Sequence, residues 1–185
     1  LGSEVTLVYR GDNILRGFDD DLREHLRAEM EKRGIKIVTR KTVEAIEKVD
    51  HGRCVQLSNH DSMTVDQVMF ATGRRPNIAG IGLQAAGVRV NDKGAITVDR
   101  FSQTSVPNIY AVGDVTDRVN LTPVAIREGH AFADTVFGGR PVAVDHSDVP
   151  TAVFSEPELG VIGLTEAQAR RDFALQNSLP LRPQR

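Results

Sequence analysis

The first forty residues alternate between strand-like and helix-like patterns, and this order constrains the fold more than any other feature of the chain. An apolar stretch at 5–8 precedes a turn of Gly, Asp and Asn, and a second apolar stretch follows at 35–39. Between them, Leu22, Leu26 and Met30 recur every four residues, which is typical of one face of a helix. Strand, helix and strand in this order predict a βαβ unit, and therefore an α/β fold with a parallel sheet.

Capping residues predict where this helix begins and ends. Asp19 fits the N-cap, because its carboxylate can accept hydrogen bonds from the unpaired N–H groups of a first turn. Gly34 fits the left-handed residue that commonly follows a helix. We therefore expect a helix over 20–33, with 5–9 and 35–39 as parallel neighbours.

Later segments predict further strands and a second helix. A His-Gly pair at 51–52 fits a hairpin turn. Around it and beyond it we expect strands at 41–50 and 53–58, a buried strand at 66–73, a hairpin over 88–99 with its turn at 91–94, an apolar strand at 106–114, and a strand-rich piece from 149. The segment 121–139 predicts a helix, with Thr122 as N-cap, Pro123 at the first helical position and two glycines as the stop.

Composition narrows the classes of partner. The formal net charge is −2 and the isoelectric point about 6.2, which gives no support to nucleic-acid or membrane-surface binding. No apolar run approaches the ~18 residues that span a bilayer. Cys54 is the single cysteine and cannot close an intrachain disulfide, and the five histidines show no metal-ligand spacing with it. We predict no nucleic-acid, membrane or metal partner.

Two arginines flank the turn that follows the first apolar stretch. In a dinucleotide-binding βαβ unit the second strand ends beside the adenosine ribose, where a carboxylate suits NAD and an arginine suits the 2′-phosphate of NADP. No carboxylate stands at the end of this strand, whereas Arg10 and Arg16 lie on either side of the turn. They are candidate ligands of a phosphate dianion; two solvated loop arginines are the alternative interpretation.

Two further positions suit a nucleotide cofactor. Asp114 ends the predicted strand "NIYAVGD", and a carboxylate there faces the crevice where α/β sheets bind ligands and can hold sugar hydroxyls. The helix that begins at Thr122 offers free N–H groups and a positive dipole end to an anion such as a reduced flavin. A turn aspartate and an ordinary packing helix are the alternatives.

Taken together and in this order, five motifs resemble the flavoprotein disulfide reductase family. They are "LVYRGDNILRGFD", "ATGRRPN", "NIYAVGD", "LTPVAI" and "PTAVFSEPELGVIGLTEAQA". The resemblance runs from Leu1 to about Arg171, and within the family the chain is most similar to members that use NADPH to reduce glutathione disulfide. It implies a cytoplasmic homodimeric enzyme with FAD and NADPH as cofactors.

The resemblance also implies an organisation and roles for single residues. Residues 1–72 match the later part of an NADPH domain, 73–148 the returning part of an FAD domain, and 149–185 the start of an interface domain. Five residues match cofactor-binding positions: Arg10 and Arg16 at the 2′-phosphate, Gly73 beside NADPH, Asp114 at the FAD ribitol, and Thr122 with its backbone N–H at the flavin.

Some parts of the family's machinery do not appear in the 185 residues. There is no Gly-x-Gly-x-x-Gly, no Cys-x4-Cys, and the family's acid/base His-Glu pair has no counterpart, so we assign no catalytic residue. We expect an internal fragment that is not competent alone. His130 stands where glutathione-reducing members often carry an arginine. A relative acting on trypanothione, mercuric ion or dihydrolipoamide, and a non-catalytic nucleotide-binding module, are the alternatives; the arginine pair argues against the NAD-using dihydrolipoamide type.

Overall fold

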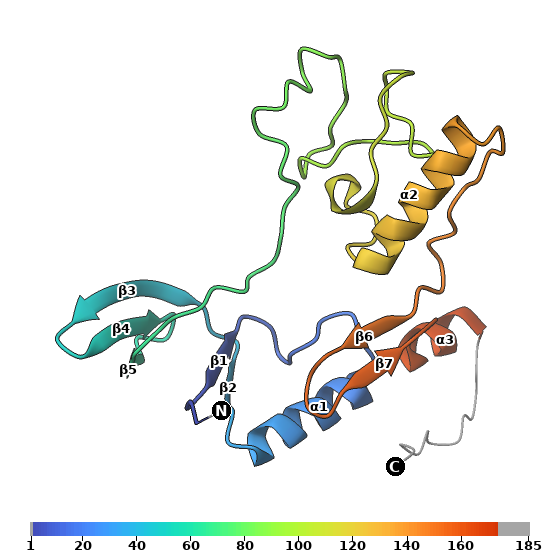
Figure 1. The fold of residues 1–185 in the computed structure, drawn as a ribbon. Coiled ribbons are helices and arrows are strands. Elements are labelled where there is room, and N and C mark those ends of the chain that lie inside the picture. Colours follow the sequence, from blue (N-terminus) through green and yellow to red (C-terminus); the bar gives the residue numbers. More distant parts are fainter. Residues whose placement is uncertain (1, 174–185) are drawn as a thin grey trace. The chain divides into compact units, whose positions relative to one another are not determined.

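The computed structural model describes residues 2–173, and these adopt an α/β fold (Figure 1). The chain divides into two compact units. The first unit comprises the residues up to Phe70 together with those from Asp148 onward, and the second unit runs from Ala71 to Ser147. No helix in the described part of the chain is long and apolar enough to cross a bilayer.

The first unit contains the βαβ element that the sequence predicts. Strands β1 (Thr6–Tyr9) and β2 (Lys36–Thr39) pair in parallel, and helix α1 (Asp20–Lys32) connects them. The N-cap prediction is also confirmed, because Oδ1 of Asp19 accepts a hydrogen bond from the N–H of Asp21 at 3.1 Å. The helix ends one residue earlier than expected.

Three side chains from different parts of this element form its core. Ile14 comes from the turn after β1, Leu26 from α1 and Ile37 from β2, and they are 6%, 2% and 9% exposed. Met30 and Leu159 pack against them. Burying a side chain of this kind stabilises a fold by about 1.5–3 kcal/mol, so the cluster fixes the turn against the helix.

A three-stranded antiparallel sheet follows β2. It consists of β3 (Val43–Val49), β4 (Gly52–Leu57) and β5 (Ser62–Val65), and the predicted hairpin between β3 and β4 is confirmed. Gly52 has a φ of +111°, and a Cβ there would lie 2.4 Å from the carbonyl oxygen of Val65. Only glycine fits this position.

The strand-rich piece from residue 149 is confirmed as well. Strands β6 (Thr151–Val153) and β7 (Leu159–Val161) pair antiparallel and lie beside α1 (Figure 1). Helix α3 (Glu166–Phe173) follows, and it is not among the elements that the sequence predicts. The backbone N–H of Thr165 donates to Oε1 of Gln168, and the backbone N–H of Gln168 donates to the hydroxyl of Thr165. This reciprocal pair is a capping box, and its pattern of Thr followed three residues later by Gln is a sequence signature of a helix start.

The predicted buried strand at 66–73 is wrong. This segment forms no strand, and Met69 and Phe70 are 88% and 64% exposed. A strand is stable only when its N–H and C=O groups find a neighbouring ladder. Strand β5 ends at Val65, and no described strand pairs with the residues that follow.

The predicted strand at 106–114 is also wrong. Only an isolated bridge between Gln103 and Tyr110 occurs there, and the backbone then turns into a short 3₁₀ helix, η1 (Gly113–Thr116). The apolar pattern instead reflects packing, because Ala111 is buried in the core cluster of the second unit. The apolar side chains of this segment therefore pack into the core as part of a loop and do not belong to a sheet.

The predicted hairpin over 88–99 is reduced to its turn. Oδ1 of Asn91 accepts hydrogen bonds from the N–H groups of Lys93 and Ala95, which confirms the turn. Beyond it, the two arms meet only at the single bridge between Val90 and Ile96.

Helix α2 (Thr122–Val136) confirms the second predicted helix but begins differently. The N-cap is Leu121, whose backbone is extended and whose carbonyl accepts from the N–H of Ala125 at 3.1 Å. Thr122 is therefore the first helical residue and provides no side-chain cap. The backbone N–H of Thr122 is therefore one of the groups that a helix leaves unpaired at its start.

Candidate functional site

The turn after β1 presents two arginines without partners. Arg10 and Arg16 are both exposed, and neither makes a hydrogen bond or an ion pair with the residues that the structure describes. Other arginines of the same unit are paired with carboxylates: Arg23 with Asp20, Arg27 with Glu31, Arg33 with Glu156 and Arg40 with Asp12. Among the arginines of this turn and of α1, Arg10 and Arg16 are therefore the two whose charge is not already paired with a described carboxylate.

This turn is held in place from two sides. Ile14 anchors it in the core, and Arg23 of α1 binds its backbone. The Nε of Arg23 donates to the carbonyl of Ile14 at 2.7 Å, and Nη2 donates to that of Asn13 at 2.9 Å. Arg23, which the sequence analysis did not single out, thus fixes the segment that carries Arg16.

A hollow of about 770 Å³ opens between the turn and α1. Ligand pockets span roughly 300–1,000 Å³, so its size suits part of a nucleotide. Arg16 lines it and Arg10 does not. Three of the carboxylates in its wall, Asp12, Asp20 and Glu31, are paired with arginines, which leaves Glu24 as the acidic group there without an ion pair among the described residues.

The other predicted site residues belong to the second unit. Asp114 lies in η1, and its Oδ2 forms an ion pair with Nη2 of Arg74 at 3.0 Å. This contact brings the motif "ATGRRPN" beside the predicted ribitol aspartate. Gly73, the neighbour of Arg74, has a φ of +116° and open space where a Cβ would stand. An L-residue at this position would be strained by its backbone rather than by a clash.

The start of α2 packs directly on the turn that carries Asp114. A Cβ on Gly113 would come within 3.0 Å of the Cβ of Ala125, so the two backbones approach closely. The first turn of α2 contains no acidic residue, which leaves its positive dipole end unneutralised. The structure thus brings Asp114 and the helix start at Thr122 together.

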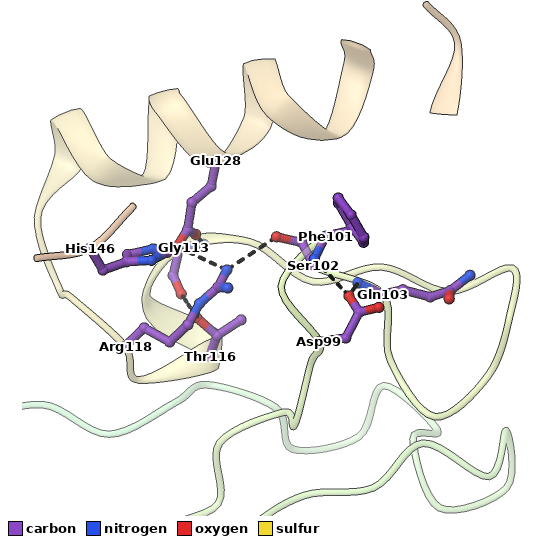
Figure 2. Close-up of polar contacts among 9 residues, drawn as sticks. All are labelled: Asp99, Phe101, Ser102, Gln103, Gly113, Thr116, Arg118, Glu128 and His146. Atoms are coloured by element: carbon purple, nitrogen blue, oxygen red, sulfur yellow. Dashed lines mark hydrogen bonds and ion pairs between the residues drawn. The ribbon is translucent and has the colours of Figure 1, made fainter. Parts of the chain in front are cut away.

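Sequence patterns missed a polar centre behind this turn. Glu128 of α2 is 1% exposed and contacts Gly113, Arg118 and His146 (Figure 2). One signal was available, because Glu128 shares the buried stripe of α2 with Val124 and Ala131. By contrast, the neighbouring His130 is exposed.

The loop that contains His146 is stabilised by hydrogen bonds between the two residues on either side of it. Asp145 accepts hydrogen bonds from the backbone N–H and the hydroxyl of Ser147, at 2.9 and 2.8 Å. These two hydrogen bonds hold the pKa of Asp145 below its ordinary value. No group of three His, Cys, Asp or Glu residues in the described range is placed to hold a metal ion.

A family model now gives these features a context. Residues 1–129 match the pyridine nucleotide-disulphide oxidoreductase family. The chain belongs to this family. The match spans β1, the basic turn, α1 and η1, and reaches the first half of α2, so it includes all five predicted cofactor-binding residues.

Named relatives agree with this assignment. The glutathione reductase of Burkholderia cepacia is 55% identical over 174 residues, which are 94% of this chain and 39% of that protein. The trypanothione reductase of Trypanosoma congolense is 48% identical over 94% of this chain and 35% of its own length. Among solved structures, the HOCl-induced flavoprotein disulfide reductase RclA from Escherichia coli is similar with a TM-score of 0.87 and 31% identity, over 92% of this chain and 39% of that one. The chain therefore spans about two fifths of the relatives it matches.

Proposed function

We propose that the whole protein is an FAD-containing enzyme that uses NADPH to reduce glutathione disulfide. The observation that carries the proposal is the pair of exposed arginines without partners, Arg10 and Arg16, on a turn that the core and Arg23 hold in place. A guanidinium forms charge-assisted hydrogen bonds to a phosphate dianion. Neither arginine has to break an ion pair with a described residue before it binds.

The residues of the second unit fit a flavin nucleotide. When bound, FAD accepts electrons from NADPH and passes them on to a disulfide. The carboxylate of Asp114 can accept hydrogen bonds from ribitol hydroxyls once it exchanges its exposed partner Arg74 for them. The free N–H groups at the start of α2 favour negative charge on the flavin ring.

The relatives support glutathione disulfide as the substrate, with trypanothione disulfide as the second candidate. The glutathione reductase named above is the more similar, at 55% against 48% identity. His130 favours the second candidate, because the resemblance places an arginine there in many glutathione-reducing members. The chain holds the single cysteine Cys54 and contributes no redox disulfide of its own. A homodimer and a cytoplasmic location belong to the same proposal and rest on the family resemblance.

A chimaera tests the proposal. In the Burkholderia cepacia enzyme, the 174 aligned residues are replaced by those of this chain, and we call the product the chimaera. We expect it to purify with a visible flavin band and to oxidise NADPH with glutathione disulfide faster than with trypanothione disulfide. The unmodified host enzyme is the control.

Two results contradict the proposal. A folded chimaera that lacks flavin shows that the second unit does not bind FAD. A chimaera that turns over trypanothione disulfide faster than glutathione disulfide, while the host prefers glutathione disulfide, assigns the protein to the second candidate.

A further inference from the structure

Glu128 is a carboxylate in an apolar stripe, where a charge needs compensation. It is 1% exposed and lies on α2 between Val124 and Ala131, which are themselves buried. A buried carboxylate destabilises a fold strongly unless it is paired and hydrogen-bonded. The hydrogen bonds and ion pairs of the Glu128 carboxylate therefore indicate its role in the fold.

The two carboxylate oxygens divide their contacts. Oε2 accepts the backbone N–H of Gly113 at 2.5 Å, whereas Oε1 contacts Nη2 of Arg118 at 2.9 Å and Nε2 of His146 at 2.6 Å. Figure 2 shows the side chain of Glu128 pointing from α2 toward these three groups. One oxygen thus holds backbone, and the other faces the two nitrogen groups.

Both backbone polar groups of Gly113 are held. Its N–H is bound by Glu128, and its carbonyl accepts from the hydroxyl of Thr116 at 2.8 Å. Nε of Arg118 donates to the same hydroxyl at 3.3 Å, so the two contacts belong to one network (Figure 2). Gly113 has a φ of +73° and immediately precedes Asp114. Its backbone sets the direction in which the Asp114 side chain leaves the turn.

We propose that Glu128 is a positioning residue, which fixes the Gly113 amide and thereby orients Asp114 for the ribitol of FAD. The inference rests on the flavin role proposed for Asp114. The reach of Glu128 to Gly113 matters for the cofactor, whereas its charge matters for the contacts with Arg118 and His146.

Two substitutions separate reach from charge. Glu128→Gln keeps the length of the side chain and an oxygen that can accept from Gly113, but it removes the charge. Glu128→Asp keeps the charge, but it is one methylene shorter and loses the hydrogen bond to Gly113. Asp134→Asn is the matched control, because Asp134 is an ion-paired carboxylate on the same helix, with Arg140 as its partner.

The exchange rate of the Gly113 amide proton is measured by NMR in the 185-residue chain, and the FAD dissociation constant is measured in the chimaera. We expect Glu128→Asp to raise both by about tenfold or more, the effect of losing one hydrogen bond to a charged group. Glu128→Gln should change both by less than about threefold, although it lowers the melting temperature. Asp134→Asn should leave the exchange rate and the FAD affinity unchanged.

The proposal is overturned if FAD affinity follows charge, so that Glu128→Gln weakens binding and Glu128→Asp does not. It is also overturned if both variants bind FAD as the unmodified chimaera does. An unmodified chimaera that binds no FAD refutes the proposed function instead. In that case, the Gly113 exchange rate in the chain decides the role of Glu128, and an unchanged rate in Glu128→Asp overturns it.

Discussion

Replacing Arg10 and Arg16 by glutamine in the chimaera should remove the preference for NADPH. A hydrogen bond between a charged guanidinium and a phosphate contributes about 1.5–3 kcal/mol. Neither arginine is ion-paired with a described residue. Binding of the phosphate therefore breaks no existing ion pair, and the full contribution of each contact is lost in the glutamine variant. Losing both contacts should lower kcat/KM for NADPH by roughly 10²–10⁴-fold, whereas kcat/KM for NADH should hold within about threefold.

The assay is steady-state oxidation of each nucleotide with saturating glutathione disulfide. Arg33→Gln is the matched control, because Arg33 is an exposed arginine of the same unit that is already paired with Glu156 and does not line the hollow. It should leave the ratio of NADPH to NADH kinetics unchanged. Since Arg16 lines the hollow beside α1 and Arg10 does not, Arg16→Gln alone should lower kcat/KM for NADPH at least as much as Arg10→Gln.

A double variant that loses kcat/KM for NADPH and for NADH equally would contradict a role of the arginine pair in nucleotide selection. Equal losses would mean that the two side chains support the fold of the turn and do not contact the 2′-phosphate.

Four other predictions address the fold and the cofactor sites. Leu26→Ala should reduce the free energy of unfolding by about 2–5 kcal/mol in urea titrations, because Leu26 is 2% exposed, and an unchanged midpoint would contradict the core assignment. Arg23→Met in the chimaera should raise KM for NADPH and leave FAD affinity unchanged, since it releases the basic turn and Asp20 in the first unit, whereas Asp114 belongs to the second. The carboxylate of Asp145 should titrate below its ordinary pKa by NMR; its stabilising effect is present above the unfolded-state pKa and lost as pH falls through the lowered folded value, and an ordinary pKa would exclude the hydrogen bonds from Ser147. The isolated 185-residue chain should neither retain FAD through purification nor oxidise NADPH with glutathione disulfide, because it has one cysteine and no Gly-x-Gly-x-x-Gly; a flavin band or turnover would contradict this.

Local signals explain why the βαβ element was predictable. The cap at Asp19, the stripe through Leu26 and the glycine at Gly34 each act within one or two turns of chain. The hairpin before Gly52 and the turn at Asn91 are equally local. Each of these features depends on residues close in sequence, so a pattern of residues is sufficient to indicate it.

Features that depend on distant partners were not predictable in the same way. The apolar segments at 66–73 and 106–114 have the composition of strands, yet a strand also requires a neighbouring ladder, which composition does not reveal. The N-cap of α2 is Leu121 and not Thr122, because Leu121 has the extended backbone of an N-cap and Thr122 is already helical. The side-chain preference of threonine for the N-cap therefore gave the wrong position. Glu128 depends on Arg118 and His146, which come from two separate loops.

The candidate site divides along the same line. Arg10 and Arg16 were identified from their place after a strand, but only coordinates reveal that they lack ion-pair partners among the described residues while their neighbours are paired. Asp114 was identified from its motif, and its contact with Arg74 was not. Sequence therefore indicates which residues are candidates, and the structure shows which charges are available.

A crystal structure of the chimaera with NADPH bound tests the central claim most directly. The account predicts that the 2′-phosphate lies within hydrogen-bonding distance of the guanidinium groups of both Arg10 and Arg16, with Arg23 still bound to the carbonyls of Asn13 and Ile14. A 2′-phosphate that faces solvent, or that is held by other side chains while both arginines remain unengaged, would contradict it.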